Sequence, residues 1–116
     1  MSNKPTTAFK VLTADEMRAL EADRFTGSPI DLADGYIHLS TEQQLTETVD
    51  KHFSGQSDLW IAAVDLGALG DRIEWERSRG GDVFPHLYGG LSLEVVFAYC
   101  PLERDHKGTV RLPVAG

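Results

Sequence analysis

Residues 34–41 read DGYIHLST, and this segment runs from a predicted strand into a predicted helix start. Ile37 and Leu39 point to one side of the strand and His38 to the other, because side chains alternate along an extended chain. The letters STEQ at residues 40–43, which begin in this segment and run past its end, form a helix-capping pattern. Apolar side chains then follow at four-residue steps. We therefore predict a half-buried strand that displays His38 and leads directly into a helix over residues 42–53.

The sequence on either side of this segment predicts one further helix and several strands. The letters TADE at residues 13–16 have the spacing of a capping box, in which a threonine hydroxyl and a glutamate carboxylate bond to each other's backbone, so a helix begins there. Both helices come early, and the later strands follow one another without a helical crossover. We therefore predict an α+β domain with a split, mainly antiparallel sheet of about seven strands and two helices. The other strands are expected to include residues 8–12, 59–64, 72–77, 93–99 and 108–112.

The composition indicates one compact domain. The chain has 116 residues, of which 41% are hydrophobic and 25% charged, which suits a single core of modest size over residues 1–116. Residues 1–7 are expected to be a flexible N-terminus, and residues 103–116 a C-terminal extension or edge strand. The single cysteine, Cys100, excludes an internal disulfide and a zinc site made of several cysteines.

Charge and hydropathy argue against two classes of partner. The formal net charge of −7 opposes nonspecific attraction to nucleic acid and to anionic membranes. No uninterrupted apolar run is longer than the six residues at 59–64, which is far shorter than the ~20 residues that a membrane-spanning helix needs. No signal peptide precedes the first strand, so we expect a cytoplasmic protein that acts on a small-molecule ligand or a nucleotide.

The segment 78–90 is the first candidate for a functional site. It holds five glycine or proline residues among aromatic and ionisable ones. Pro85 restricts the residue before it, so the backbone at His86 is held in a defined direction. One interpretation is a shaped loop that displays His86 and Tyr88 to a ligand. The alternative is a tight connection between two strands with an incidental histidine.

His38 is the second candidate, because it lies where a strand passes into a helix. Free backbone amides and the positive end of a helix attract anionic groups at such junctions. Ser40 or Thr41 would both cap the helix and touch the ligand. The alternative is a histidine with a purely structural hydrogen bond. His52 and His106 are interpreted as solvated.

The order of these segments is similar to that of a known family. The blocks DGYIHLST at 34–41, IEWE at 73–76 and FPHLYG at 84–89 resemble the domain of unknown function 952 family, over about residues 9–101. That family looks like a compact relative of the ADP-ribosyltransferase superfold, whose split antiparallel sheet binds NAD in a central cleft. The resemblance implies a small bacterial-type cytosolic domain that uses NAD as a substrate and no metal.

The same resemblance implies roles for particular residues. His38 and His86 are expected to be catalytic and to bond to ribose or phosphate oxygens. The positive charge that builds on the ribose as nicotinamide leaves would be stabilised by positioning and electrostatics rather than by a strong base. Lys10 stands where related sequences often carry a histidine that holds the ribose. Ligand contacts are expected from Lys10, Tyr36, Ser40, Thr41, Tyr88 and Glu94.

Three other functions stay open at this point. The same cleft would bind a nucleotide or a small anion without converting it, which the absence of a clear transferase glutamate favours. A metal site would draw on His38, His86 and either Glu74 or Glu76, completed by water. An interaction module would instead pair the edge of the strand at residues 93–99 with another chain. No motif fixes the oligomeric state or the acceptor.

Overall fold

The computed structural model describes residues 5–78 and 80–113. Most helical residues lie in the first part of the chain, and the strands pair antiparallel, so the predicted α+β class is confirmed. In chain order the elements are β1 (Thr7–Leu12), α1 (Ala14–Glu21), α2 (Pro29–Asp34), β2 (Ile37–His38), α3 (Glu42–His52), β3 (Trp60–Asp65), α4 (Leu66–Leu69), the 3-10 turn η1 (Gly70–Arg72), β4 (Ile73–Arg77), β5 (Val83–Leu87), the 3-10 turn η2 (Leu93–Val95) and β6 (Val96–Pro101).

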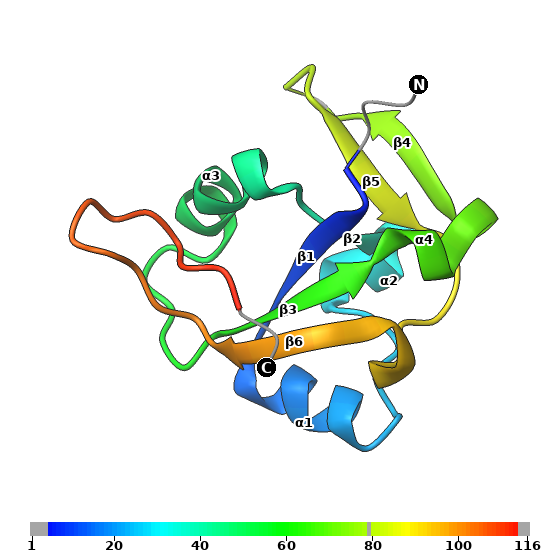
Figure 1. Cartoon of the computed structure of the whole chain (residues 1–116), viewed down its shortest axis with the longest axis horizontal. Coiled ribbons are helices and arrows are strands. Elements are labelled where there is room, and N and C mark those ends of the chain that lie inside the picture. Colours follow the sequence, from blue (N-terminus) through cyan, green and yellow to red (C-terminus); the bar gives the residue numbers. More distant parts are fainter. Residues whose placement is uncertain (1–4, 79, 114–116) are drawn as a thin grey trace.

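Two three-stranded antiparallel sheets form the framework (Figure 1). One sheet has the order β1-β3-β6 and the other the order β2-β5-β4. The sheets meet where β1 passes the end of β2, because Phe9 and Ser40 exchange two backbone hydrogen bonds of 2.8 and 2.9 Å. An isolated antiparallel bridge therefore joins the two sheets.

The β1-β3-β6 sheet is covered on both faces, as the continuous apolar sequence of β3 requires. Leu45 and Val49 of α3 pack on one face. Met17 and Leu20 of α1 pack on the other face, together with Leu87 from the inner face of the second sheet. Each fully buried side chain of this size contributes about 1.5–3 kcal/mol to the free energy of unfolding. The junction of the two sheets is thus tied to the main core.

The segment 78–90 is not the shaped loop that the sequence suggested. Its middle part, Val83–Leu87, is the central strand of the smaller sheet. Proline normally avoids such a position. Here the carbonyl of Pro85 accepts a hydrogen bond of 3.2 Å from Leu39 N–H, so the missing donor of Pro85 also faces β2, which is only two residues long. The cost to the sheet is therefore small.

The predicted strand at residues 108–112 is also wrong. Only an isolated bridge joins Val110 to Arg104 there. The carboxylate of Asp105 accepts hydrogen bonds from two backbone N–H groups further on, including that of Thr109, which turns the chain after a single paired residue. The described residues therefore form six strands rather than the predicted seven. They also form four α-helices rather than the predicted two, because the short helices α2 and α4 lie in segments that were interpreted as a loop and a turn.

Two boundaries differ from the prediction as well. Residues 93–95 form a 3-10 turn instead of starting a strand, and β6 begins only at Val96. At the other end of the chain, Thr7 already opens β1, and the carbonyl of Thr6 accepts a hydrogen bond of 3.0 Å from Leu66 N–H. Residues 1–4 of the predicted flexible N-terminus lie outside the described residues.

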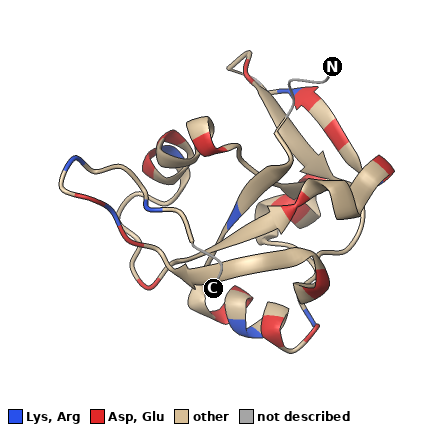
Figure 2. Cartoon of the chain, viewed as in Figure 1, with Lys and Arg blue, Asp and Glu red and all other residues tan. Residues whose placement is uncertain are grey.

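The charge pattern follows the composition. Acidic side chains are spread over several elements, including β4, and basic ones are fewer (Figure 2). None of the helices within the described ranges is long and apolar enough to cross a membrane.

Candidate functional site

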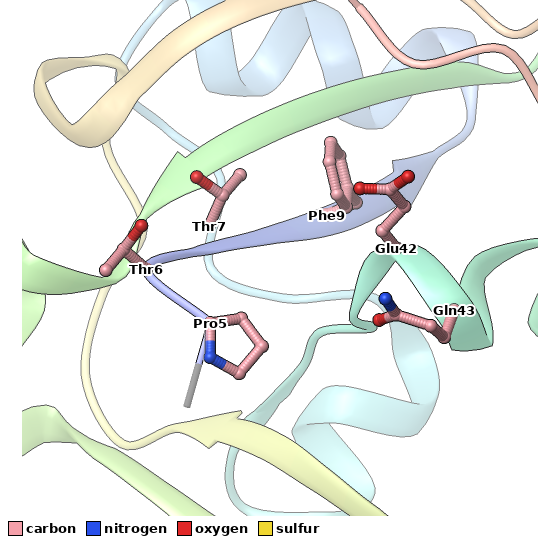
Figure 3. Close-up of a pocket in the computed structure, with 6 residues that line it drawn as sticks. All are labelled: Pro5, Thr6, Thr7, Phe9, Glu42 and Gln43. Atoms are coloured by element: carbon pink, nitrogen blue, oxygen red, sulfur yellow. The ribbon is translucent and has the colours of Figure 1, made fainter. Parts of the chain in front are cut away.

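A surface pocket lies between the start of β1 and the start of α3, but its lining offers little chemistry. Its volume is about 310 Å³. Figure 3 shows the side chains that line it. The lining contains one carboxylate and no histidine or basic side chain. The residues are Pro5, Thr6, Thr7, Phe9, Glu42 and Gln43.

Two of the four histidines, His38 and His86, instead lie together on the outer face of the smaller sheet. His38 of β2 lies directly opposite His86 of β5 in the antiparallel register, and Glu74 of β4 lies opposite His86 on the other side. The adjacent row, Ile37 and Leu87, points into the core. This alternation places both imidazoles on one face, with ring centroids 5.5 Å apart.

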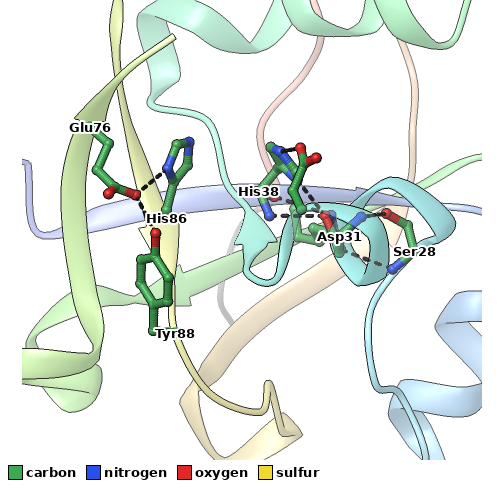
Figure 4. A network of polar contacts seen from close by, with 8 residues as sticks. Ser28, Asp31, His38, Glu76, His86 and Tyr88 are labelled. Carbon is green, nitrogen blue, oxygen red and sulfur yellow. Dashed lines mark hydrogen bonds and ion pairs between the residues drawn. The ribbon is translucent and has the colours of Figure 1, made fainter.

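His38 is fixed by a buried ion network that comes from α2 (Figure 4). Oδ1 of Asp31 lies 2.6 Å from Nδ1 of His38 and also accepts a hydrogen bond of 3.0 Å from the His38 backbone N–H. Oδ2 of Asp31 lies 2.8 Å from Nζ of Lys10. Nε2 of His38 lies 3.0 Å from Oδ2 of Asp34, so neither ring nitrogen of His38 is left free.

This network keeps Asp31 ionised although its side chain is only 1% exposed. Burial acts to raise the pKa of Asp31, but the hydrogen bond to His38 and the charge of Lys10 outweigh it. The pKa therefore lies well below its ordinary value. The carboxylate also accepts a hydrogen bond of 2.9 Å from the backbone of Ser28, which fixes the start of α2.

His86 is held from the opposite side of the sheet face. Its Nδ1 lies 2.7 Å from Oε1 of Glu76 on β4, and the hydroxyl of Tyr88 donates a hydrogen bond of 2.8 Å to the same oxygen. The hydrogen bonds from His86 and Tyr88 lower the pKa of Glu76. The bond to Glu76 raises the pKa of Tyr88 to about 12. The described residues give no hydrogen bond to Nε2 of His86.

Tyr36 joins the two histidines into one cluster. Its ring stacks on His86 with centroids 4.0 Å apart and planes inclined by 21°. It also contacts His38 at 4.7 Å and Tyr88 at 5.3 Å between centroids. Burial and the carboxylates of Asp34 and Glu76 raise the pKa of Tyr36. We call Tyr36, His38, His86 and Tyr88 the ring cluster.

A small pocket adjoins the ring cluster beside Tyr36. It has a volume of about 180 Å³. Gly35 and Gly89 leave the backbone bare along its wall, and Leu32 lines it with an exposed apolar side chain. The remaining lining residues are Thr26, Asp31, Tyr36 and Ile37.

The other predicted contact residues take different places. The ammonium of Lys10 is buried and pairs with Asp31. It also donates a hydrogen bond to the backbone carbonyl of His38, so it helps to position that residue. Ser40 is buried, and its hydroxyl lies 3.0 Å from that of Thr48. Thr41 is buried at the start of α3, where its N–H donates to the Gln44 side chain. Glu94 is exposed in η2, and the structure gives it no bond to the ring cluster.

Three acidic residues of the site were not singled out from the sequence as its members, although Glu76 was weighed as a metal ligand. Asp31 and Asp34 lie on α2, in a segment that the sequence reading treated as a loop. A signal was present: Ser28 and Asp31 have capping-box spacing, with proline at the first helical position and Gly35 at the end. Glu76 had no comparable signal, because it reaches His86 only through the β4–β5 pairing.

The metal alternative finds no support in this geometry. Within residues 5–78 and 80–113, no group of three or more histidine, cysteine, aspartate and glutamate side chains is placed to hold a metal ion. The Nδ1 atoms of His38 and His86 each face a carboxylate in a different direction.

Comparison with known proteins agrees with the fold. The family model described as "Protein of unknown function (DUF952)" matches residues 11–99. The crystal structure of protein CC0527 from Caulobacter crescentus is 44% identical, with a TM-score of 0.82, and the match covers 92% of this chain and 95% of that one. The solution structure of the same protein gives 44% identity and a TM-score of 0.76, over 91% of each chain. A search of curated proteins found no match. The chain therefore belongs to the DUF952 family.

Proposed function

We propose that the ring cluster binds the nicotinamide and ribose end of NAD, and that the chain is an ADP-ribosyltransferase-like enzyme. The observation that carries this proposal is the pair of histidines, His38 and His86, beside the junction of the two sheets. They stand side by side on neighbouring strands, and a carboxylate orients each ring. Groups fixed in this way are preorganised, so they need not rearrange as a reaction proceeds.

The charge of the site suits cleavage of a bond between ribose and nicotinamide. Nicotinamide leaves as a neutral molecule while positive charge builds on the ribose. Asp34 and Glu76 supply negative charge on either side of the ring cluster. The charge of Asp31 is balanced by Lys10 and serves to orient His38. A carboxylate stabilises a developing cation more strongly in the lower dielectric of a protein than in water.

The shape of the site sets a limit on how NAD would lie. The pocket beside Tyr36 holds about 180 Å³, less than the roughly 300 Å³ at which sites for drug-sized ligands begin. It suits one ring, which would stack on an aromatic face and leave the adenosine half on the surface. Gly89 lets a ligand approach the backbone there, because it has no side chain.

The test is release of free nicotinamide from NAD, measured by chromatography. Wild type should release it above the rate of a blank. His38→Ala and His86→Ala should each lose about 10²-fold or more of this rate, as for other positioned catalytic groups. His52→Ala is the matched control, because His52 is exposed at the end of α3 and should leave the rate unchanged. A wild-type rate equal to the blank would refute catalysis.

One observation favours a second function, the binding of a nucleotide without turnover. Both ring nitrogens of His38 face carboxylates, and the ammonium of Lys10 is paired with Asp31. The polar groups in this part of the site therefore already have partners within the chain. A protein of this kind would be stabilised by NAD or ADP-ribose and release no nicotinamide. Thermal melting with NAD or ADP-ribose, together with the assay of nicotinamide release, therefore separates the two functions.

A further inference from the structure

The two histidines of the ring cluster are not equivalent. Both nitrogens of His38 face carboxylates, Asp31 at Nδ1 and Asp34 at Nε2. His86 uses only Nδ1, which lies 2.7 Å from Glu76. Only His86 therefore has a ring nitrogen available to a bound molecule.

The free nitrogen of His86 lies on a side chain that is otherwise enclosed. The side chain is only 6% exposed. No buried polar side-chain atom among the described residues lacks a partner, so Nε2 of His86 retains some contact with solvent. Tyr36 covers the face of the ring, with centroids 4.0 Å apart. A proton can therefore reach or leave this ring through its edge.

Glu76 and Tyr88 fix the direction in which that edge points. Glu76 accepts from both His86 and Tyr88 through one oxygen, so its carboxylate is itself clamped. A carboxylate at Nδ1 selects the ring form in which Nδ1 carries the hydrogen and Nε2 carries the lone pair. A histidine oriented by a carboxylate in this way serves as a general base in many enzymes.

We infer that Nε2 of His86 accepts the proton of a neutral hydroxyl group, from water or an alcohol, as that oxygen attacks the ribose of NAD. The inference rests on the proposed function and adds the class of acceptor. The bond between C1′ of ribose and the nicotinamide nitrogen breaks, and its electron pair leaves with neutral nicotinamide. A bond forms between C1′ and the hydroxyl oxygen, and the hydroxyl proton passes to His86 and then to solvent.

The groups that face His86 agree with a neutral acceptor. From β4 these are Glu76 and, directly across the strand, Glu74; from β2 they are His38 and the adjoining Tyr36. Tyr88, which directly follows β5, completes the set. A carboxylate acceptor carries no proton to be removed and would need no base, so a base beside the reacting oxygen suits a neutral hydroxyl acceptor.

The first test does not depend on turnover. The chain is labelled with ¹⁵N-histidine, and long-range proton–nitrogen spectra are recorded at slightly alkaline pH. We expect His86 to show a protonated Nδ1 and an unprotonated Nε2. Glu76→Gln should change this pattern, whereas Glu47→Gln, an exposed carboxylate on α3, should not. A neutral ring protonated at Nε2 would overturn the inference, even if NAD is cleaved.

The second test uses azide, an anionic nucleophile that carries no proton to be removed. In His86→Ala, cleavage of NAD with water or methanol should fall about 10²-fold. Azide should restore nicotinamide release and yield the ribosyl azide. His38→Ala should not be rescued, because His38 positions the substrate. His86→Gln serves in place of His86→Ala if that variant does not fold.

The outcomes of the two tests separate the two proposals. Failure of azide to restore the His86 variants, while wild type still cleaves NAD, overturns the role of His86 alone. Absence of nicotinamide release by wild type, with the expected ring form in the spectra, overturns the proposed function and with it the acceptor assigned here.

Discussion

His38 and His86 lie opposite each other across the β2–β5 pair, yet acidic side chains from opposite sides of the site hold their rings. Asp31 and Asp34 of α2 hold His38, and Glu76 of β4 holds His86. The site therefore lies between α2 and the β4–β5 hairpin, and its geometry depends on both.

The ion pair beneath His38 should be important for stability. Asp31→Ala leaves the buried ammonium of Lys10 without its partner, so the free energy of unfolding should fall by about 3–5 kcal/mol. Asp15→Ala removes an exposed carboxylate that pairs with Arg18, and its effect should be less than about 1 kcal/mol. Urea denaturation measures both. Equal losses would show that Lys10 is solvated rather than buried.

The same residue predicts a loss of stability in acid. The folded-state pKa of Asp31 lies below its unfolded value of about 3.9, so its stabilising effect is complete above that pH. The effect is lost as the pH falls through the folded-state pKa. The free energy of unfolding of wild type should therefore decrease below about pH 4 more steeply than that of Asp31→Asn. Parallel curves for the two proteins would contradict this assignment.

The hydrogen bond between Tyr88 and Glu76 predicts that the Tyr88 hydroxyl loses its proton only at a higher pH than an ordinary tyrosine. The pKa of Tyr88 is raised to about 12 from an ordinary value of 10.0, because its hydroxyl donates to the Glu76 carboxylate. Glu76→Gln should bring it back toward the ordinary value. Tyr99, which donates to Glu21, should keep its own pKa in that variant and serves as the internal reference. Ring-carbon NMR as a function of pH reports each tyrosine separately.

NAD should stabilise the folded chain. A ligand present at a hundred times its Kd adds about 2.7 kcal/mol to the free energy of unfolding, which raises Tm by several degrees. His38→Ala should abolish the shift, because His38 is part of the ring cluster. His52→Ala should retain it. An unchanged Tm of wild type at millimolar NAD would count against both the catalytic and the binding function.

The turn from α2 into the site should depend on glycine. Gly35 ends α2 with φ at +87°, a conformation that costs other residues about 1–2 kcal/mol. Gly35→Ala should therefore destabilise the chain by roughly that amount and disturb Tyr36, the next residue. Gly90→Ala is the control, because a methyl group there meets nothing within 4 Å and the position has no positive φ. An equal loss in both variants would show that the positive φ of Gly35 is not the cause.

Sequence reasoning found the ring cluster more completely than it found the residues that support it. Tyr36, His38, His86 and Tyr88 were all expected at the site, and the structure brings them together. Ser40 and Thr41 were expected to touch a ligand, and they lie buried beside the start of α3. The difference arises because period-two alternation tells which face a strand residue occupies, but not what later covers it.

The sequence by itself determined the α+β class, the strand that carries His38, the start of α3 and membership in the family, because these depend on local periodicity, capping patterns and short motifs. Only the tertiary structure decided that Lys10 pairs with Asp31, that Glu76 orients His86, and that one histidine has a free nitrogen. These contacts join residues at separations of 21 and 10 along the chain. They form only when α2 packs beside β2 and β4 pairs with β5, and the free energy of burying the shared core selects that arrangement.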